Sequence, residues 1–201
     1  MITVFHSPRS RSLRVLWMAE EMGLAYEALP GSLFQPSEAF LAANPTRTLP
    51  AMVDGETVLT ESTAILQYLG ARHGPTPLVP SADSPAFPDF LQFLAYGEAT
   101  LACNLTPLVR TRFMAPDDQK DNWTVKNCGE TFVRRLLLVE RQLEKGPWMA
   151  GRDFTAADIS VGYALGFGDF LGLTDQYPSA VADYWARLQA RPAFQRAAAV
   201  Q

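Results

Sequence analysis

The stretch LPAMVDGETVLTES, residues 49–62, decides the fold of this chain. An Asp-Gly dipeptide in its middle separates two short runs of strand-forming residues, which is a strong signal for a β-hairpin with a tight turn. We therefore predict antiparallel strands near residues 51–53 and 57–59. A helical pattern follows immediately, from about residue 62 to residue 72, so that a helix begins directly after the hairpin.

The residues before this stretch alternate between strand and helix patterns. Strands are expected at the N-terminus, around Ile2 and Val4, and at residues 26–29, and helices at residues 12–22 and 37–43. The first of these helices is apolar on more than one side, which indicates burial on several sides. The order β-α-β-α-β-β-α predicts a small α/β layer with a mixed sheet.

The chain changes character at residues 74–88, which contain five prolines and therefore read as a linker. Beyond it only helical patterns follow, near residues 87–113, 118–144, 156–170 and 178–190, with a short one from residue 192. We predict a first domain at residues 1–77, a linker at 78–85 and an all-helical domain at 86–201. Within the latter, Thr155 and Asp158 have the spacing of a capping box at a helix N-terminus.

Composition excludes several classes of function. A net charge of −4 and a pI near 5.2 argue against a general nucleic-acid binder. Two cysteines without a CxxC pair, and two histidines, argue against a structural zinc site, and no metal is expected. The thiols are expected to be buried and reduced. Neither a signal peptide nor a membrane span is recognisable, so the sequence predicts a cytoplasmic protein that binds no membrane.

Three segments together resemble the soluble glutathione S-transferases: SPRSRSLRVLW at residues 7–17, RTLPAMVDGETVLTESTAILQYL at 47–69 and GRDFTAADIS at 151–160. The resemblance covers nearly the whole chain. It implies an α/β plus all-α protein, with a thioredoxin-like N-terminal domain followed by an all-helical C-terminal domain. It is closest to the bacterial serine-type branch, similar to theta, zeta and beta-like members, because no tyrosine ends the first strand and no cysteine lies near Arg11.

The resemblance implies a glutathione site in the first domain. A cis bond between Leu49 and Pro50 would let the Leu49 backbone pair with the cysteinyl part of glutathione. Glu61 and Ser62 would hold the ammonium and the carboxylate of the γ-glutamyl part, the latter at a helix N-terminus. Read as structure alone, Ser62 is a helix N-cap. Three residues in flanking loops complete the expected site: Gln35, Arg47 and Thr48. Of these, Gln35 and Arg47 are expected to reach the glycyl carboxylate.

The segment around Ser10 is expected to stabilise the glutathione thiolate. A free thiol has a pKa of about 8.5, so little of it is ionised at neutral pH. A serine hydroxyl can donate a hydrogen bond to the sulfur, and positive charge and a helix N-terminus act in the same direction. The spacing of Ser10 and Arg14 resembles the theta-type arrangement, but another serine-type alignment puts Arg9 at the active position. The candidates for the catalytic role are Ser10, Arg11 and Ser12, with Ser7 as a further fallback.

In the helical half, the resemblance implies a pocket for a small hydrophobic electrophile. Its expected lining comprises Ser7, Arg9, Tyr96, Thr100, Asn104 and Tyr163. The resemblance also implies a detoxifying transferase that acts as a homodimer. Isomerisation, dehalogenation, peroxide or disulfide reduction stay open as reactions, as does a non-catalytic glutathione-binding or regulatory module of the same fold. The physiological electrophile is not fixed by any motif.

Overall fold

A four-stranded mixed sheet organises the first part of the chain, in a computed structural model that describes residues 1–120 and 122–201. The strand order is β2-β1-β3-β4, with β1 parallel to β2 and antiparallel to β3. The strands are β1 (Ile2–His6), β2 (Tyr26–Pro30), β3 (Ala51–Asp54) and β4 (Thr57–Thr60). The helices of this part are α1 (Ser12–Met22), α2 (Glu38–Ala43) and α3 (Ser62–Arg72). This is the predicted element order.

The hairpin predicted from residues 49–62 joins β3 and β4. Each of its strands is one residue longer than predicted, because Asp54 pairs with Thr57 and Thr60 pairs with Ala51. The two turn residues are therefore Gly55 and Glu56. Since the register of a hairpin follows from its turn, this short loop fixes which side chains face the core.

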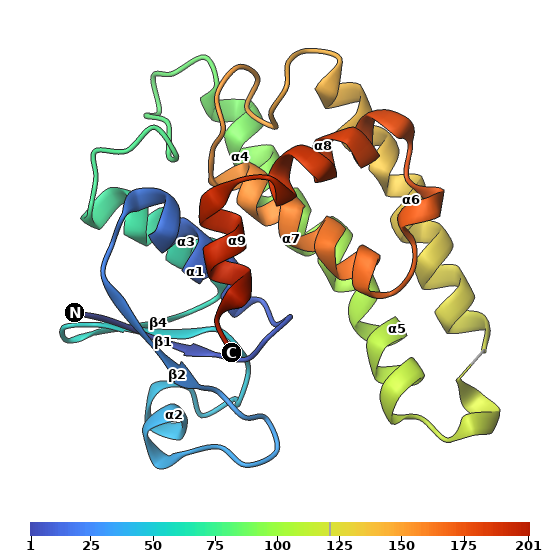
Figure 1. Cartoon of the computed structure of the whole chain (residues 1–201), viewed down its shortest axis with the longest axis horizontal. Helices are drawn as coiled ribbons and strands as arrows, with labels where there is room; N and C mark the ends of the chain where they lie inside the picture. The colour runs from blue at the N-terminus through green and yellow to red at the C-terminus, as the bar shows by residue number, and fades with distance from the viewer. Residues whose placement is uncertain (121) are drawn as a thin grey trace. The chain divides into compact units, whose positions relative to one another are not determined.

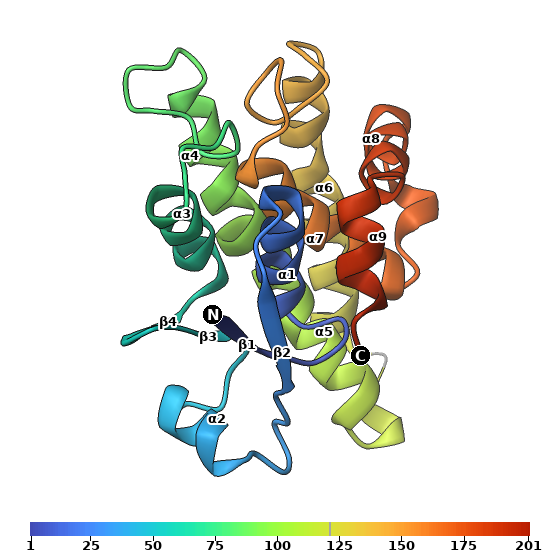
Figure 2. The ribbon, with the colours of Figure 1, turned by 60° about the vertical axis from the view of Figure 1, so that its left-hand side comes forward.

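Helices cover both faces of the sheet. Figures 1 and 2 show α1 and α3 on one face and α2 on the other. The prediction that the first helix is buried on several sides is confirmed, since its side chains from Arg14 to Ala19 are all buried. Gly23 ends α1 in the left-handed conformation, with a φ of 65° that glycine adopts without steric cost.

The C-terminal residues belong to this first unit, which differs from the predicted boundaries. The chain divides into one unit of Met1–Val79 with Gln189–Gln201 and another of Pro80–Leu188. Helix α9 (Pro192–Ala199) packs along α1 (Figure 1). The rings of Trp17 and Phe194 meet edge to face with centroids 4.8 Å apart. These contacts, far apart in sequence, assign the last residues to the first unit rather than to the helical domain.

The second unit is helical, as predicted, apart from an isolated β-bridge between Trp148 and Gly151. The helix expected at 87–113 consists of three joined pieces, with a π-helical segment in the middle. Helix α6 begins at Trp123 rather than at residue 118. Asn122 caps it, since its side-chain oxygen accepts a hydrogen bond from the Val125 amide. Asp121 lies outside the described residues. The helices are α4 (Phe87–Ala95), the π-helix Tyr96–Ala102, α5 (Cys103–Met114), α6 (Trp123–Leu143), α7 (Ala156–Phe170) and α8 (Ser179–Gln189), with short 3₁₀ turns at Asp117–Gln119 and Thr174–Gln176.

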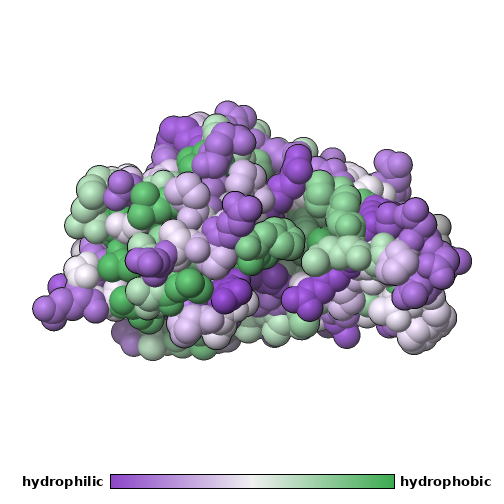
Figure 3. All heavy atoms as spheres, turned by 90° about the horizontal axis from the view of Figure 1, so that it is seen from below, coloured by the Kyte–Doolittle hydropathy of each residue, from purple (hydrophilic) through white to green (hydrophobic). Residues whose placement is uncertain are grey.

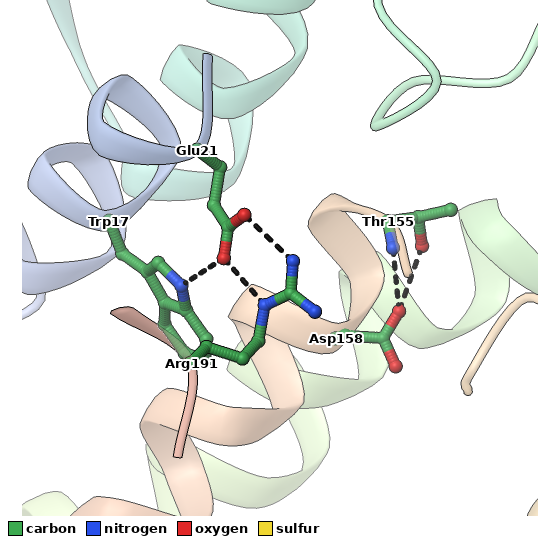
Figure 4. A network of polar contacts seen from close by, with 5 residues as sticks. All are labelled: Trp17, Glu21, Thr155, Asp158 and Arg191. Atoms are coloured by element: carbon green, nitrogen blue, oxygen red, sulfur yellow. Dashed lines mark hydrogen bonds and ion pairs between the residues drawn. The ribbon is translucent and has the colours of Figure 1, made fainter. Parts of the chain in front are cut away.

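The predicted capping box at Thr155 and Asp158 is confirmed. The Thr155 amide and hydroxyl both donate to Oδ2 of Asp158, over 2.8 and 3.2 Å (Figure 4). Oδ1 of the same carboxylate accepts from the Met149 amide and the Tyr184 hydroxyl. Burial raises the pKa of Asp158 to about 6, although these four hydrogen bonds lower it. The carboxyl group ties the start of α7 to the preceding loop and to α8.

Two surface properties bear on the predictions. Cys103 is exposed and Cys128 is partly buried, and both are free; the expectation that both thiols are buried is therefore wrong for Cys103, which lies on the outer side of its helix. In the part of the chain that the structure describes, no helix is both long and apolar enough to cross a membrane. Figure 3 shows hydrophobic residues on the viewed face in several patches, separated by hydrophilic ones.

Candidate functional site

The sheet register brings the predicted first-domain residues to one edge. In the antiparallel ladder, Phe5 pairs with Ala51 and Ala51 pairs with Thr60. The end of β1, the start of β3 and the end of β4 therefore lie side by side. Strand β2 runs parallel to β1, so that its last residue, Pro30, lies beside His6. The connecting segments that begin or end at this edge are residues 7–11, 31–37 and 44–50 and the single residue 61, after which α3 begins.

A chain of three side chains links the first loop to the interior of the sheet. The Ser10 and Ser12 hydroxyl oxygens are 2.6 Å apart. The Ser12 hydroxyl lies 2.8 Å from Nδ1 of His6, and Nε2 of His6 lies 3.3 Å from the backbone carbonyl of Val200. Ser12 is fully buried, whereas Ser10 is half-buried. The structure thus joins two predicted serines to a histidine and to the C-terminal segment.

The polarity of this chain follows from its inner end. A backbone carbonyl only accepts hydrogen bonds, so Nε2 of His6 carries a proton and donates to Val200. In the neutral imidazole Nδ1 is then an acceptor, and the Ser12 hydroxyl donates to it. Because Ser12 has only one hydroxyl proton, Ser10 is the donor in the contact between the two serines. The proton of Ser10 therefore points inward.

His6 is held in its neutral form by its surroundings. It lies in register with Ile2 and Val4 on β1, and all three side chains are buried. Burial lowers the pKa of His6 and is the largest influence on it, while the hydrogen bond to the Val200 carbonyl opposes that shift. A neutral imidazole at the end of the chain can accept a proton.

The N-termini of α1 and α3 are joined at the same edge. Nη1 of the buried Arg14 donates to the Ser62 hydroxyl over 3.1 Å. This leaves the hydroxyl proton of Ser62 able to donate to a ligand. The prediction that Ser62 is the N-cap is wrong by one residue, because Glu61 has the non-helical backbone angles and Ser62 is the first helical residue. Glu61 itself is exposed.

Backbone strain is concentrated in the predicted site. Among the described residues, the non-glycine residues with positive φ are Arg9, Arg47 and Glu61, with φ between 58° and 65°. Such a conformation is uncommon for residues with a Cβ atom and is often found at functional sites. All three residues were singled out from the sequence, one in each of three segments that meet at this edge.

The loop before β3 brings Leu49 close to the end of β2. The peptide bond between Leu49 and Pro50 is cis. A Cβ atom on Gly31 would lie 2.5 Å from a methyl group of Leu49 and 3.3 Å from the backbone nitrogen of His6. A larger residue at position 31 would make the Leu49 side chain and the neighbouring backbone shift, so the absence of a side chain favours this close packing of Leu49 next to the histidine.

Buried Asn44 organises residues 44–48. Its amide donates to the Thr48 carbonyl and to the Thr48 hydroxyl, and its oxygen accepts from Thr46. The hydroxyl of Thr48 is thus part of the internal network of the loop, also touching that of Thr46 at 2.9 Å. Arg47, between the two threonines, is exposed, as is Gln35 in the segment after β2. All three predicted loop residues are therefore exposed, although the hydroxyl of Thr48 also takes part in the hydrogen bonds within the loop.

The remaining candidates of the first loop surround the serines. Arg11 occupies the N-cap position of α1 and is half-buried, while Arg9 is exposed. The amide of Ser7 donates to the Ser12 hydroxyl over 3.4 Å, so that Ser7 supports the chain through its backbone. The amide of Ser12 donates in turn to the Ser10 hydroxyl, also over 3.4 Å.

Four of the six residues predicted to line the electrophile pocket lie in the second unit, whereas Ser7 and Arg9 belong to the first. Tyr96 donates its hydroxyl to the Arg135 carbonyl over 2.8 Å, and the Thr100 carbonyl accepts from Asn104 over 2.6 Å. Tyr163 is buried, with 4% of its surface exposed, and its ring lies 5.8 Å from that of Phe167. Tyr96 and Asn104 are half-buried on the helical segment that includes the π-helix.

Sequence reasoning missed His6 and Asn44 as parts of the site. The signal for His6 was available, since alternation from Ile2 and Val4 puts it on a buried face, where a polar side chain needs partners. Asn44 gave no comparable signal beyond its place after a short helix. Among the described residues, no cluster of three or more histidine, cysteine or acidic side chains has the arrangement of a metal site.

Comparison with known proteins agrees with this geometry. Residues 4–77 match the family "Glutathione S-transferase, N-terminal domain". The chain is 31% identical to Glutathione S-transferase 3 of Zea mays, over 93% of this chain and 88% of the relative. A theta class glutathione S-transferase from Xanthomonas axonopodis pv. citri, solved with glutathione bound, is 27% identical with a TM-score of 0.81, over 100% of this chain and 98% of that one. A glutathione transferase from Methylococcus capsulatus is also 27% identical, with a TM-score of 0.84 over 98% and 97%.

Proposed function

This chain belongs to the glutathione S-transferases, and from that premise we propose that it activates the thiol of glutathione for attack on a small hydrophobic electrophile. The observation that carries the proposal is the meeting of three segments at one sheet edge. They are the Ser10 loop, Leu49 with Pro50, and the start of α3 at Glu61 and Ser62. The first is suited to a sulfur atom, the second to a peptide backbone and the third to a carboxylate.

Glutathione binding would use the last two of these segments. The start of α3 offers backbone amides, and the Ser62 hydroxyl, held by Arg14, can donate to the γ-glutamyl carboxylate. Exposed Glu61 can accept from the γ-glutamyl ammonium. Leu49 would pair with the cysteinyl backbone as an added strand does. Exposed Arg47 and Gln35 are suited to the glycyl carboxylate, while Thr48 supports the loop.

Thiolate stabilisation would use the first segment. The Ser10 hydroxyl is the outermost member of the hydroxyl–imidazole chain, half-buried at the start of α1. Arg11 at the N-cap position and the positive end of the helix favour negative charge there. We assign the sulfur contact to Ser10, with Ser12 supporting it from the interior. Arg9 and Ser7 are placed at the periphery.

The second unit would supply the electrophile site, with Tyr96, Thr100 and Asn104 on the helical segment through the π-helix. Tyr163 would contribute only from the buried layer beneath it, because little of its surface is exposed. The proposal extends to a detoxifying homodimer in the cytoplasm. The two free thiols, one of them exposed, are consistent with a reducing compartment.

The test is calorimetric titration with glutathione and with S-methylglutathione, together with turnover of soft electrophiles, on the wild type and Ser10→Ala. We expect both ligands to bind the wild type and glutathione-dependent turnover that falls in Ser10→Ala, by about tenfold to a thousandfold. Failure of glutathione to bind would refute the proposal. Binding without turnover of any electrophile would instead indicate a non-catalytic glutathione-binding module.

A further inference from the structure

We propose that His6 is the acceptor of the glutathione thiol proton, which reaches it through the hydroxyl groups of Ser10 and Ser12. The inference rests on the proposed function, because it concerns the same thiol. It assigns a role to a residue that touches no substrate atom and acts through two serines. It also gives the C-terminal segment a part in the site, since the Val200 carbonyl fixes which imidazole nitrogen is open to the proton.

The resting direction of the hydrogen bonds makes Ser10 an acceptor on its outer side. Its single proton is directed to Ser12, whose own proton is directed to Nδ1 of His6. A hydroxyl whose proton is used in this way presents lone pairs to an approaching group. The first contact with a thiol is therefore S–H donating to the Ser10 oxygen. In that state Ser10 does not donate to sulfur.

Proton transfer along the chain reverses the hydrogen bonds that join Ser10, Ser12 and Nδ1 of His6, while Nε2 of His6 still donates to the Val200 carbonyl. The S–H bond breaks and its proton bonds to the Ser10 oxygen, while the former proton of Ser10 passes to Ser12. The former proton of Ser12 bonds to Nδ1 of His6. The products are a thiolate and an imidazolium, so charge and protons balance and no other reactant is needed. Ser10 now donates to the sulfur, Ser12 donates to Ser10, and both ring nitrogens of His6 are donors.

This scheme explains how a serine can serve a thiol although its own hydroxyl is a very weak acid. Ser10 never carries a negative charge, because it gives one proton and receives another. Burial keeps His6 neutral before the ligand arrives, so that Nδ1 is open. A thiolate formed nearby favours the imidazolium through opposite charge, in a region of low dielectric where such attraction is strong.

The alternative is that the thiol proton leaves to solvent and His6 stays neutral as a purely structural residue. The two schemes differ in one observable, the protonation of His6 in the glutathione complex. Only two histidines are present, His6 and His73. Nε2 of His73 contacts Asp54 at 2.7 Å, and Asp54 pairs with Ile2 at the start of β1. His6 is at the other end of this strand, about 13 Å away. His73 is therefore an internal reference.

The experiment is ¹⁵N NMR of the histidine side chains in the full chain at neutral pH, without ligand, with glutathione and with S-methylglutathione. We expect His6 to change from the neutral Nε2–H form to the imidazolium with glutathione alone, and His73 to be unchanged. A His6 that stays neutral while glutathione binds and is turned over would overturn the inference and leave the proposed function intact. Absence of glutathione binding would overturn both.

Two variants extend the test to the thiolate itself. His6→Asn keeps a neutral acceptor near Nδ1, and His6→Gln keeps a neutral donor toward Val200, but neither accepts a proton. If His6 takes up the proton, each variant lowers the thiolate fraction of the glutathione complex at neutral pH by about tenfold. This corresponds to a rise of about one unit in the pKa of the bound thiol. The KM for glutathione should change little. His73→Asn is the matched control. An unchanged thiolate fraction in a folded His6 variant would refute the relay, and should both variants fail to fold, the wild-type NMR decides.

Discussion

The guanidinium of Arg191 donates two hydrogen bonds to the carboxylate of Glu21, over 2.6 and 2.8 Å, across 170 positions of sequence (Figure 4). The indole of Trp17 donates to the same carboxylate over 2.9 Å. This two-bond pair connects the residue before α9 to α1, and only 10% of the Glu21 side chain is exposed. It holds in place the segment whose Val200 carbonyl contacts His6.

Removal of this pair is expected to loosen the C-terminal segment. Arg191→Ala leaves a largely buried carboxylate with one donor fewer on each oxygen, so we expect a loss of about 1–3 kcal/mol in unfolding free energy. The matched control is Arg196→Ala. Arg196 contacts Glu20, but 56% of the Arg196 side chain is exposed, so this substitution should lower the unfolding free energy by at most about 1 kcal/mol. Denaturant unfolding measures both, and equal losses would contradict the structural ranking.

The unfolding free energy of the ligand-free protein is expected to fall on mild acidification because of His6. Burial lowers the pKa of His6 in the folded state relative to its ordinary value of 6.5. As the pH falls, His6 therefore takes up a proton in the unfolded chain before it does so in the folded one. The stabilisation that neutral His6 gives the folded state is fully present above pH 6.5 and is lost as the pH falls through the lower pKa of the folded state. The unfolding free energy falls by at most about 1.4 kcal/mol per pH unit. Unfolding curves between pH 5 and pH 8 should be less steeply pH-dependent in His6→Asn than in His73→Asn.

The two serines of the chain are expected to differ in their effect on stability. Ser12→Ala leaves Nδ1 of buried His6 without its donor and removes the acceptor for Ser10. We expect a loss of about 1–3 kcal/mol, against about 0.5–1 kcal/mol for Ser10→Ala, whose side chain is half-buried. Thermal and denaturant unfolding test this order. A larger loss of unfolding free energy in Ser10→Ala than in Ser12→Ala would contradict the view that the inner hydroxyl, of Ser12, contributes more to stability.

The start of α3 is expected to control glutathione affinity without affecting the thiol. Ser62→Ala removes a hydroxyl that accepts from Arg14 and can donate to a carboxylate. We expect Kd for both glutathione and S-methylglutathione to rise by about tenfold, the loss of one hydrogen bond to a charged group. Thr63→Ala, one residue further along the same helix, is the matched control and should leave both Kd values nearly unchanged. A change confined to glutathione would place Ser62 near the sulfur instead.

Local sequence signals predicted the parts of the fold that local interactions determine. The hairpin at residues 49–62 follows from its turn, and the box at Thr155 and Asp158 from a spacing of three residues. Contacts between distant segments were not predictable in this way. Glu21 and Arg191 are individually ordinary surface residues in sequence, and only the folded chain shows that they pair and bring residues 189–201 back to the first unit.

The site was predicted unevenly for the same reason. Ser10, Ser12, Leu49, Glu61 and Ser62 stand in motifs, and the register of the sheet brings their segments to one edge. The link from Ser12 to His6 and on to Val200 joins three segments of the chain, and no motif contains it. Exposure of Cys103 was also missed, because residue type alone favours burial of a cysteine.

The buried carboxylate of Asp158 is expected to be the most costly single side chain to remove from the second unit. It accepts from the amides of Met149 and Thr155 and from the hydroxyls of Thr155 and Tyr184, all in the interior. Asp158→Ala leaves these donors unpaired, so we expect a loss of about 3–5 kcal/mol. Tyr184→Phe removes one of the four donors and should cost about 1 kcal/mol.

Titration of Asp158 provides an independent check on the same group. Its pKa is raised by burial from 3.8 to about 6, so the folded chain retains a proton that the unfolded chain releases. The stabilising contribution is complete below pH 3.8 and is lost as the pH rises through about 6. The loss of unfolding free energy in Asp158→Asn, relative to wild type, should therefore be larger at pH 5 than at pH 7, by about 1 kcal/mol. A difference that instead grows toward pH 7 would show that the four donors, rather than burial, dominate the pKa of this carboxyl.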